Sequence, residues 1–226
     1  MSYTEYTAEE LLGPLNEVEQ KNAPPRLYVS GDVSLLRNGP RVSVVGSRKV
    51  SEDGKKRTRA LSKILVERGA VVVSGLAEGV DTEAHTTAIA CGGRTIAVLG
   101  TPLSEFFPKQ NSALQERIMR EHLAVSQFAH SGGRKSFPMR NRTMALLSDA
   151  TVITEAGEGS GSRHQGWEAL RLGRPLFLME SLVSAGLTWV KEMLEYDAQV
   201  LTRDGIDFMF EFLPQGDRDA ANSLSI

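Results

Sequence analysis

The sequence predicts an α/β protein built on a doubly wound, mainly parallel sheet flanked by helices. Three observations predict this fold class. Short apolar runs alternate with segments of helical periodicity along the middle of the chain. The runs are apolar at every position, as is typical of strands buried on both faces of a parallel sheet. Glycine-rich segments follow the runs, at the strand ends where such sheets bind ligands.

Each expected element has its own local pattern. Thr7 and Glu10 have the spacing of a capping box and predict a short first helix, which the Asn22-Ala-Pro-Pro25 break follows. The β-branched runs predict strands at 42–45, 71–74, 95–99, 150–154 and 175–179. Helical periodicity predicts helices at 51–69, 81–92, 111–119 and 162–173, and Pro138 suits the first turn of one more.

Length and composition place the chain among folded globular proteins. Its 226 residues are 41% hydrophobic and 24% charged, which excludes a wholly disordered or collagen-like protein. Cys91 is the only cysteine, so intramolecular disulfides and a cysteine-rich zinc site are excluded, and we expect a buried thiol. No apolar run approaches the ~20 residues that span a bilayer. The acidic N-terminus does not resemble a signal peptide, so we expect a soluble, cytoplasmic protein.

We expect three parts in the chain: an N-terminal helical extension at 1–24, a main α/β domain at 25–212, and a polar C-terminal tail at 213–226. The charged side chains are also unevenly distributed, with both ends of the chain acidic. Residues 1–20 carry five acidic and no basic side chains, and residues 191–226 carry eight acidic and three basic ones. The middle of the chain therefore holds 23 basic against 15 acidic side chains. This asymmetry is compatible with an anionic ligand in the middle, and equally with chance.

Four expected strands are each followed by a loop that suits an anionic ligand. Glycine permits sharp turns and close backbone approach, hydroxyls donate hydrogen bonds, and helix N-termini favour negative charge. The candidate binding residues in these loops are Gly46, Ser47, Arg48, Ser74, Gly75, Gly79, Gly100, Thr101, Ser160, Gly161 and Ser162. Asp81 follows the second strand, where it either caps the next helix or belongs to the site.

A basic segment before the fourth of these strands completes the candidate site. Its members are Arg134, Lys135, Phe137, Arg140, Asn141 and Arg142. Four basic side chains with an interleaved aromatic suit a phosphate backbone with a base stacked on the ring, although a lone phenylalanine is more often a core residue. Because the last two arginines are two positions apart on a helix, we expect one to reach the site and the other to pair inside the fold, with Glu155 as a candidate partner.

Catalytic and metal-binding patterns are absent from the sequence. It holds no G-x-S-x-G elbow, no P-loop lysine motif and no H-E-x-x-H. The four histidines lack metal-ligand spacing, and His85 fits a structural histidine on a helix. We therefore expect no metal, no cofactor and no catalytic residue.

Together these residues resemble the DprA/Smf family of bacterial DNA-processing proteins. The resemblance covers about residues 25–180 and rests on segments in the family's order, namely Leu27-Tyr28-x-x-Gly31, Val45-Gly46-Ser47-Arg48, Ser74-Gly75-Leu76-Ala77 with Gly79, Asp81 and His85, Ile96 to Thr101, Phe107-Pro108 with Asn111, Phe137-Pro138-x-Arg140-Asn141-Arg142, Leu147 to Ala150, and Glu155 to Ser162.

The resemblance implies an extended Rossmann-like fold and a non-enzymatic protein that binds single-stranded DNA. It further implies a homodimer that hands the strand to a RecA-type recombinase during DNA uptake and recombination. Arg48 would hold a phosphate, Arg134 would lie on the DNA path and Phe137 would stack on a base. Such binding is salt-sensitive and nearly independent of base sequence.

Two alternatives use the same strand-end pocket. The fold implied by the resemblance is similar to that of the LOG-type phosphoribohydrolases, whose loop glutamate falls here on Gln165, a side chain unable to act as acid or base. Glu168, one helical turn further, is the possible substitute. The other alternative is a sensor that binds a nucleotide without cleaving it, with Arg163 and His164 as ligand contacts.

Overall fold

The computed structural model describes residues 3–214, and within them nine strands form a single sheet. The C-terminal tail expected at 213–226 lies almost wholly outside the described residues. The strands are β1 (Thr4–Tyr6), β2 (Leu27–Gly31), β3 (Arg41–Gly46), β4 (Val71–Ser74), β5 (Thr95–Leu99), β6 (Leu123–Ser126), β7 (Ala150–Glu155), β8 (Leu176–Met179) and β9 (Gln199–Leu201).

The sheet is parallel except at one edge. Its order is β1-β2-β6-β5-β4-β3-β7-β8-β9, in which β1 and β2, and β2 and β6, are antiparallel and every other pair is parallel. The chain runs outward from β3 to β6 in one direction and then from β7 to β9 in the other. The winding therefore reverses between β3 and β7, the position at which doubly wound sheets open a crevice at their carboxyl ends.

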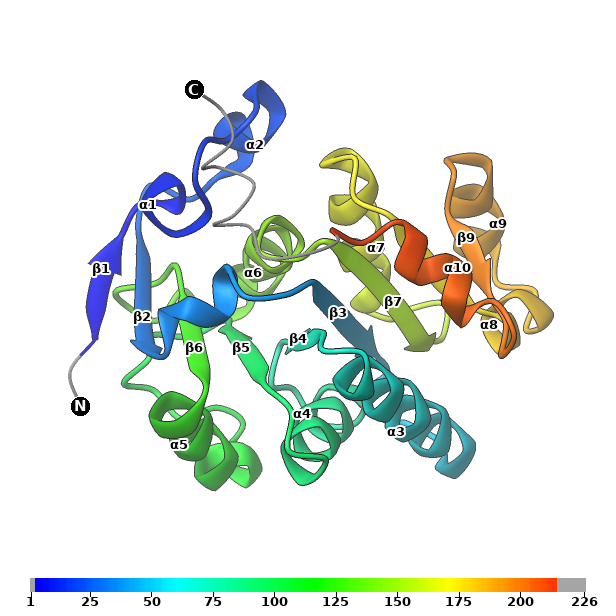
Figure 1. Cartoon of the computed structure of the whole chain (residues 1–226), viewed down its shortest axis with the longest axis horizontal. Helices are drawn as coiled ribbons and strands as arrows, with labels where there is room; N and C mark the ends of the chain where they lie inside the picture. Colours follow the sequence, from blue (N-terminus) through cyan, green and yellow to red (C-terminus); the bar gives the residue numbers. More distant parts are fainter. Residues whose placement is uncertain (1–2, 215–226) are drawn as a thin grey trace.

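Helices cover both faces of the sheet (Figure 1). Apolar side chains of α3, α4 and α10 pack on one face, where α5 continues the layer, and those of α6, α7 and α9 pack on the other. The α-helices are α1 (Ala8–Leu12), α2 (Glu17–Asn22), α3 (Glu52–Glu67), α4 (Val80–Ala90), α5 (Ser112–Glu121), α6 (Ser136–Leu146), α7 (Ser162–Arg171), α8 (Glu180–Ser184), α9 (Thr188–Glu195) and α10 (Ile206–Glu211). Short 3₁₀ helices occur at Val33–Leu36, Lys109–Asn111 and Gly133–Lys135.

The fold class and the central strands are confirmed. The predicted strands correspond to β3, β4, β5, β7 and β8, and their buried residues alternate between the apolar clusters of the two faces. The sequence analysis did not predict β1, β2, β6 or β9. Three of these lie at or next to an edge of the sheet, and β1 is largely exposed, so it lacks the continuous apolar run of a central strand. The segment at 1–24 thus contains a sheet strand besides its helices.

The predicted helix starts are also confirmed. Thr7 and Glu10 form the expected capping box, and Ser51 caps α3 by accepting a hydrogen bond from the Gly54 N–H. One expectation about a single side chain is wrong. Cys91 is exposed, because it follows the last turn of α4 and leaves the packed face. Of the two alternatives for Asp81, the N-cap is excluded, because Gly79 takes that position; Asp81 lies buried in the first turn of α4 and lines the main cavity described below.

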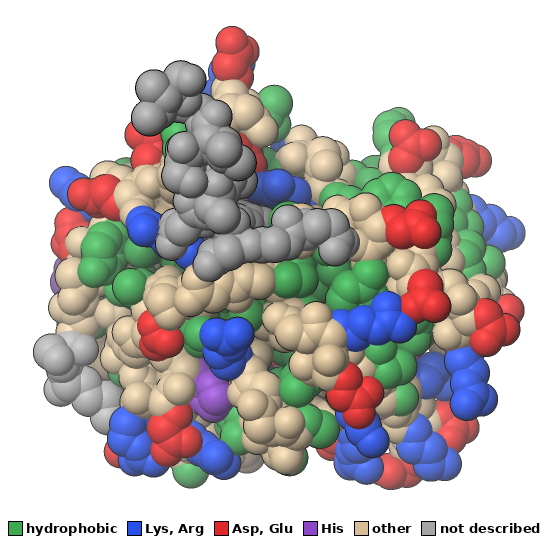
Figure 2. Space-filling model, viewed as in Figure 1, with side chains coloured by type: hydrophobic (Ala, Val, Ile, Leu, Met, Phe, Trp, Pro, Cys, Tyr) green, Lys and Arg blue, Asp and Glu red, His purple; other side chains and the backbone are tan. Residues whose placement is uncertain are grey.

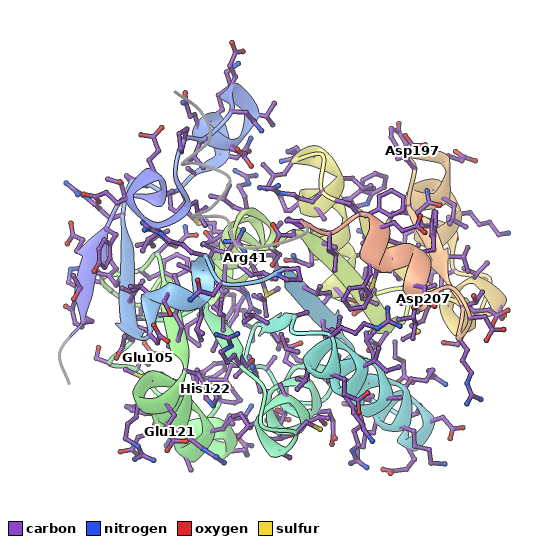
Figure 3. The ribbon with its side chains drawn as sticks, viewed as in Figure 1. Arg41, Glu105, Glu121, His122, Asp197 and Asp207 are labelled. Carbon is purple, nitrogen blue, oxygen red and sulfur yellow. The ribbon has the colours of Figure 1, made fainter. Side chains whose placement is uncertain are left out.

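A buried ion pair joins the start of β3 to the turn before β7. Arg41, 1% exposed and labelled in Figure 3, donates from its guanidinium to Asp149 at 3.1 and 3.3 Å. Its backbone N–H donates to the same carboxylate at 2.8 Å. The arginine also donates to the Leu36 carbonyl at 2.9 Å. These bonds hold β3 and β7 in register, and so define the spacing of the two loops at their opposite ends.

The surface carries charges of both signs. On the face shown in Figure 2, basic and acidic side chains lie next to each other along the lower edge. Several such neighbours are ion pairs along one helix, such as Arg117 with Glu121 on α5. In residues 3–214, the helices are all too short or too polar to cross a membrane.

Candidate nucleic-acid interface

A cavity of about 550 Å³ opens where the winding of the sheet reverses, between the carboxyl ends of β3 and β7. The loop after β3, the start of α6 and the loop that leads into α7 form its walls. The sequence-predicted residues that line it are Gly46, Ser47, Arg48, Phe137, Arg140, Asn141, Ser160, Gly161 and Ser162. The structure thus brings together residues that lie more than 100 positions apart in the chain.

Hydrogen bonds fix the loop after β3. The Ser47 N–H donates to the Glu155 carbonyl at 2.7 Å, and the Ser47 hydroxyl accepts from the Lys49 N–H at 3.1 Å. Gly79 packs against the backbone of Ser47 and Arg48 with a φ of +80°, where a Cβ would collide with both carbonyls. This close approach explains the second glycine of the loop after β4. The Arg48 side chain is left exposed at the cavity mouth.

Arg48 and Phe137 meet at the boundary between this cavity and a smaller one. The Arg48 guanidinium carbon lies 5.7 Å from the centroid of the half-buried Phe137 ring, within range of a cation–π interaction. On its other side the ring contacts Phe107, with centroids 5.7 Å apart. Phe137 also leans on Gly100, where a Cβ would lie 2.6 Å from its Cδ1. The ring is therefore held in place by neighbours while part of it stays open to a ligand.

The smaller cavity, of about 140 Å³, is lined by the ends of β4 and β5. Of the predicted residues, Gly75, Gly100 and Thr101 lie here, together with Arg48 and Phe137. Both large apolar rings at this point, Phe107 and Phe137, line the small cavity. Two cavities thus open on either side of one cation–aromatic pair.

Two predicted residues face the interior and not a cavity. The Ser74 hydroxyl donates to the Val44 carbonyl at 2.7 Å and is wholly buried. Gly79 contributes only its close packing, described above. The loop after β4 therefore supports the loop after β3 through Gly79, and its Ser74 hydroxyl is already hydrogen-bonded inside the fold.

Arg140 lies in the floor of the main cavity and is 6% exposed. Its guanidinium donates to the Val98 carbonyl at the end of β5, at 2.8 Å, and to the Asn141 side chain at 3.1 Å. It occupies the space that a Cβ at Gly75 would take. Arg140 thus ties α6 to the ends of β4 and β5, and positions Phe137 one turn earlier on the same helix.

Asp81 and His85 are buried near Arg140. Burial raises the pKa of the Asp81 carboxyl, and the positive charge of Arg140 opposes that rise. Burial lowers the pKa of His85 to about 3, with smaller contributions from His122 and Arg140. His85 is therefore neutral at pH 7, and its Nδ1 bonds the Thr95 hydroxyl at 2.6 Å. This confirms the structural histidine expected from the sequence.

The remaining basic residues lie around the cavity. Arg134 and Lys135 are exposed on the 3₁₀ turn before α6, and neither lines a cavity. Arg142 is the arginine that forms an ion pair, but it does so near the surface, with its side chain 41% exposed, and its partner is not Glu155. It donates from Nε to Glu168 of α7 at 2.9 Å. Glu155 instead accepts from Ser51 and Arg57 at the start of α3, because it sits at the end of β7 facing that helix.

The loop into α7 offers hydroxyls to the cavity. The Ser160 and Ser162 hydroxyls lie 2.7 Å apart, and the Ser160 hydroxyl also accepts from the Ser162 N–H at 3.4 Å. The first turn of α7 holds no acidic residue, so the positive end of the helix dipole is not neutralised within the helix, while the buried Asp81 lines the same cavity. Sequence reasoning missed several lining residues: Val45, Lys49, Ala77, Pro138, Met144, Gly157, Gly159 and Gln165. The only sequence signal for Gln165 was its match to the glutamate position of the phosphoribohydrolase loop.

A family model described as DNA recombination-mediator protein A matches residues 4–212 of this chain, nearly its whole length. The chain belongs to the DNA recombination-mediator family. The DNA processing protein DprA of Streptococcus pneumoniae is 37% identical over 201 residues, covering 88% of this chain and 71% of that protein. The corresponding protein of Bacillus subtilis is 33% identical over 156 residues, covering 68% of this chain and 52% of that protein. The chain therefore spans between about half and 71% of these two curated relatives.

Solved structures agree with this membership. The X-ray structure of DNA processing protein A from Streptococcus pneumoniae matches with a TM-score of 0.80 and 32% identity, covering 95% of this chain and 76% of that one. The Helicobacter pylori protein, whose structure was described for its single-stranded DNA binding mode, matches with a TM-score of 0.79 and 27% identity, covering 95% of this chain and 98% of that one. A molybdenum cofactor binding protein of Rippkaea orientalis, at 17% identity and a TM-score of 0.57, shares the fold alone.

The resemblance to the DprA/Smf family and the Rossmann-like fold are thereby confirmed. The relatives are named for DNA processing and for mediating recombination, and the expectation of a protein that is not an enzyme agrees with those names.

Proposed function

We propose that this member of the family binds single-stranded DNA across the two cavities. Phosphates would contact Arg48 and Lys49 at the cavity mouth and continue along Arg134 and Lys135. A base would stack on the open part of the Phe137 ring. The observation that carries this proposal is the contact between Arg48 and Phe137. A guanidinium that can donate hydrogen bonds to a phosphate lies beside a ring on which a base can stack.

The chemistry of these residues explains what the site would select. Arginine and lysine neutralise phosphates of any sequence, and an aromatic ring stacks on any base. A single strand is required because bases paired in a duplex are not free to stack on a protein ring. The buried Arg140 would act through α6, as a positioning residue for Phe137.

The wider role is proposed from family membership. We propose that the protein protects single strands during DNA uptake and recombination in the cytoplasm, and that it loads a RecA-type recombinase on them as a homodimer. Exposed apolar side chains near the C-terminal end, Val200, Phe208 and Phe212, support an interaction surface there. The division of the chain at residues 24 and 212 stays a prediction.

A binding titration tests the proposal. A fluorescent oligo-dT strand is titrated with wild type, Arg48→Ala and Arg120→Ala, at low and at moderate salt. Arg120 is also exposed; it lies on α5, pairs with Glu121, lines neither cavity, and serves as the control for removing an arginine elsewhere on the surface. We expect affinity to fall with salt and to drop about ten- to a hundredfold in Arg48→Ala, the loss of a charge-assisted hydrogen bond. Absence of wild-type binding at both salt concentrations would overturn the proposal.

The alternative function is a nucleotide phosphoribohydrolase, and the structure gives it little support. Glu168, the acid that the sequence offered as a substitute, accepts hydrogen bonds from both Arg142 and Arg171. Its side chain is 13% exposed, and it lies outside the lining of the main cavity. Release of free base from AMP or CMP, abolished by Glu168→Gln, would revive this alternative.

A further inference from the structure

One buried residue at the strand ends has a backbone conformation that its residue type disfavours. Leu76, in the loop after β4, has a φ of +60°. In this left-handed region the Cβ of an L-residue crowds the following carbonyl, so leucine rarely adopts it. Among residues 3–214, Asp197 is the only other residue besides glycine with a positive φ, and it lies in an exposed turn. Leu76 differs because its side chain is wholly buried, in an apolar cluster with Leu99 and Ile118.

The side-chain amide of Asn111 binds this strained loop. Asn111 lies in the turn before α5 and is 6% exposed, and its Nδ2 donates to the Leu76 carbonyl at 2.9 Å. The same Nδ2 donates to the Thr82 hydroxyl of α4 at 2.9 Å. That hydroxyl in turn donates to the Ala77 carbonyl at 2.8 Å, so two successive carbonyls of the loop are bonded. A strained conformation persists only where its surroundings hold it, and Asn111 supplies a donor that does so.

The loop that Asn111 holds supports the loop that carries Arg48. Gly79 packs against the backbone of Ser47 and Arg48, as described above. The Val80 N–H donates to the Ser47 carbonyl at 3.1 Å, which adds a second contact between the two loops. The loop after β4 and Arg48 also line the same small cavity. Asn111 itself lines neither cavity, so its side chain acts on the site through the loop after β4.

We propose that Asn111 is a positioning residue for DNA binding, which holds the loop after β4 and so fixes the position of Arg48. The inference rests on the proposed function, in which Arg48 contacts a phosphate. Without the amide donor, Leu76 leaves its left-handed conformation in a fraction of the molecules, and the backbone that supports Arg48 shifts. The apparent affinity for single-stranded DNA then falls in proportion to the fraction of molecules whose loop is in place. Asn111 needs no contact with the strand.

The chain offers a matched control four residues further along. Gln115 of α5 is also buried, and its Nε2 donates to the Leu103 and Glu105 carbonyls in the loop after β5, at 3.4 and 3.2 Å. Neither of those two residues lines either cavity. Asn111→Ala and Gln115→Ala each remove a buried amide that donates to loop carbonyls, so both should lose stability. Asn111→Asp is a second variant that keeps the shape, because a carboxylate cannot donate to the Leu76 carbonyl. Urea unfolding of each variant gives the folded fraction under the binding conditions.

A double-mutant cycle with Arg48 tests the proposal. Fluorescent oligo-dT is titrated with wild type, Arg48→Ala, Asn111→Ala and the double variant, at several salt concentrations. We expect Asn111→Ala to bind about three- to tenfold more weakly, the factor that corresponds to about one hydrogen bond. Its affinity should also depend less steeply on salt, because the phosphate contact of Arg48 is partly lost. In the double variant, Asn111→Ala should add less than about twofold to the loss in Arg48→Ala, since no arginine is left to position. Gln115→Ala should bind like wild type, and Asn111→Asp like Asn111→Ala.

The outcomes separate this inference from the proposed function. A loss in Asn111→Ala that depends on Arg48 and is absent from Gln115→Ala supports the inference. If Arg48→Ala weakens binding while folded Asn111→Ala and Asn111→Asp match wild type, the inference is overturned and the proposed function stands. Additive losses in the double variant, or an equal loss in Gln115→Ala, overturn the inference in the same way. If wild type does not bind oligo-dT, or Arg48→Ala binds as tightly as wild type, the proposed function falls and the inference falls with it.

Discussion

Gly75→Ala tests whether the buried Arg140 positions the DNA-binding helix. A Cβ at position 75 would overlap the Arg140 guanidinium, which is enclosed and donates to the Val98 carbonyl at 2.8 Å. The arginine cannot move aside without breaking that bond. Its charge would also move relative to the buried Asp81, whose pKa burial already raises.

The expected loss of stability follows from these contacts. Forcing an extra methyl group into a packed interior costs about 1–3 kcal/mol. Losing a hydrogen bond from a charged group costs about 1.5–3 kcal/mol more. We expect the free energy of unfolding to fall by about 2.5–6 kcal/mol, which lowers Tm by roughly 5–25 °C for a chain of this size.

Urea and thermal unfolding measure the loss, and oligo-dT titration measures its effect on binding. Because Arg140 and Phe137 lie one turn apart on α6, the folded variant should also bind oligo-dT more weakly. Gly157→Ala is the control for stability alone, since a Cβ there meets nothing within 4 Å but the residue lines the main cavity. Its stability should stay within about 0.5 kcal/mol of wild type. If Gly75→Ala matches wild type in both stability and affinity, the positioning role of Arg140 is refuted.

Three further predictions concern single side chains. Phe137→Ala should weaken oligo-dT binding by about 1–3 kcal/mol, the value of one stacked base, as measured by fluorescence anisotropy; an unchanged affinity would remove the ring from the binding site. Glu168→Gln should release Arg142 for one more phosphate contact, steepening the slope of log affinity against log salt by about 0.7, a change that Glu83→Gln, which frees Arg59 outside the cavities, should not produce. Since burial holds the folded-state pKa of His85 at about 3, below its unfolded value near 6.5, the stability from neutral His85 is present above pH 6.5 and lost toward pH 3. Urea unfolding from pH 7 to 4 should show His85→Gln with a shallower decline than wild type, by about 1.4 kcal/mol per pH unit.

The central part of the fold was predictable from the sequence because burial on both faces leaves a clear pattern. Five strands carry apolar residues at successive positions, whereas a strand with one face in solvent alternates apolar and polar residues. β6 has the same fully buried pattern but is only four residues long, and it was missed nonetheless. The strands at the edges follow no such rule. β1 pairs only with β2, and its residues Thr4–Tyr6 are mostly exposed, so pairing with a distant strand, and not local composition, makes it a strand.

The site was predictable in its location but not in the direction of each side chain. The glycine-rich strand ends converge on the cavities, as the topology of a doubly wound sheet requires. Spacing alone indicated that Arg140 and Arg142 point in different directions, without saying which of them is buried. That depends on the space above Gly75 and on Glu168 in α7, which lies 26 residues from Arg142. Contacts of this kind arise only when the helices pack.

The pairing of β3 with β7 also sets an order of events during synthesis of the chain on the ribosome. The loop after β3 depends on Glu155, which bonds to Ser51 across 104 residues of sequence. At roughly 5–20 residues per second, that partner emerges about 5–20 seconds later. Until then the edge of β3 opposite β4, on which β7 will pair, stays open, and Arg48 lacks the cavity wall that Ser160–Ser162 will build. Nascent chains truncated before α7 should therefore lack the cavity altogether.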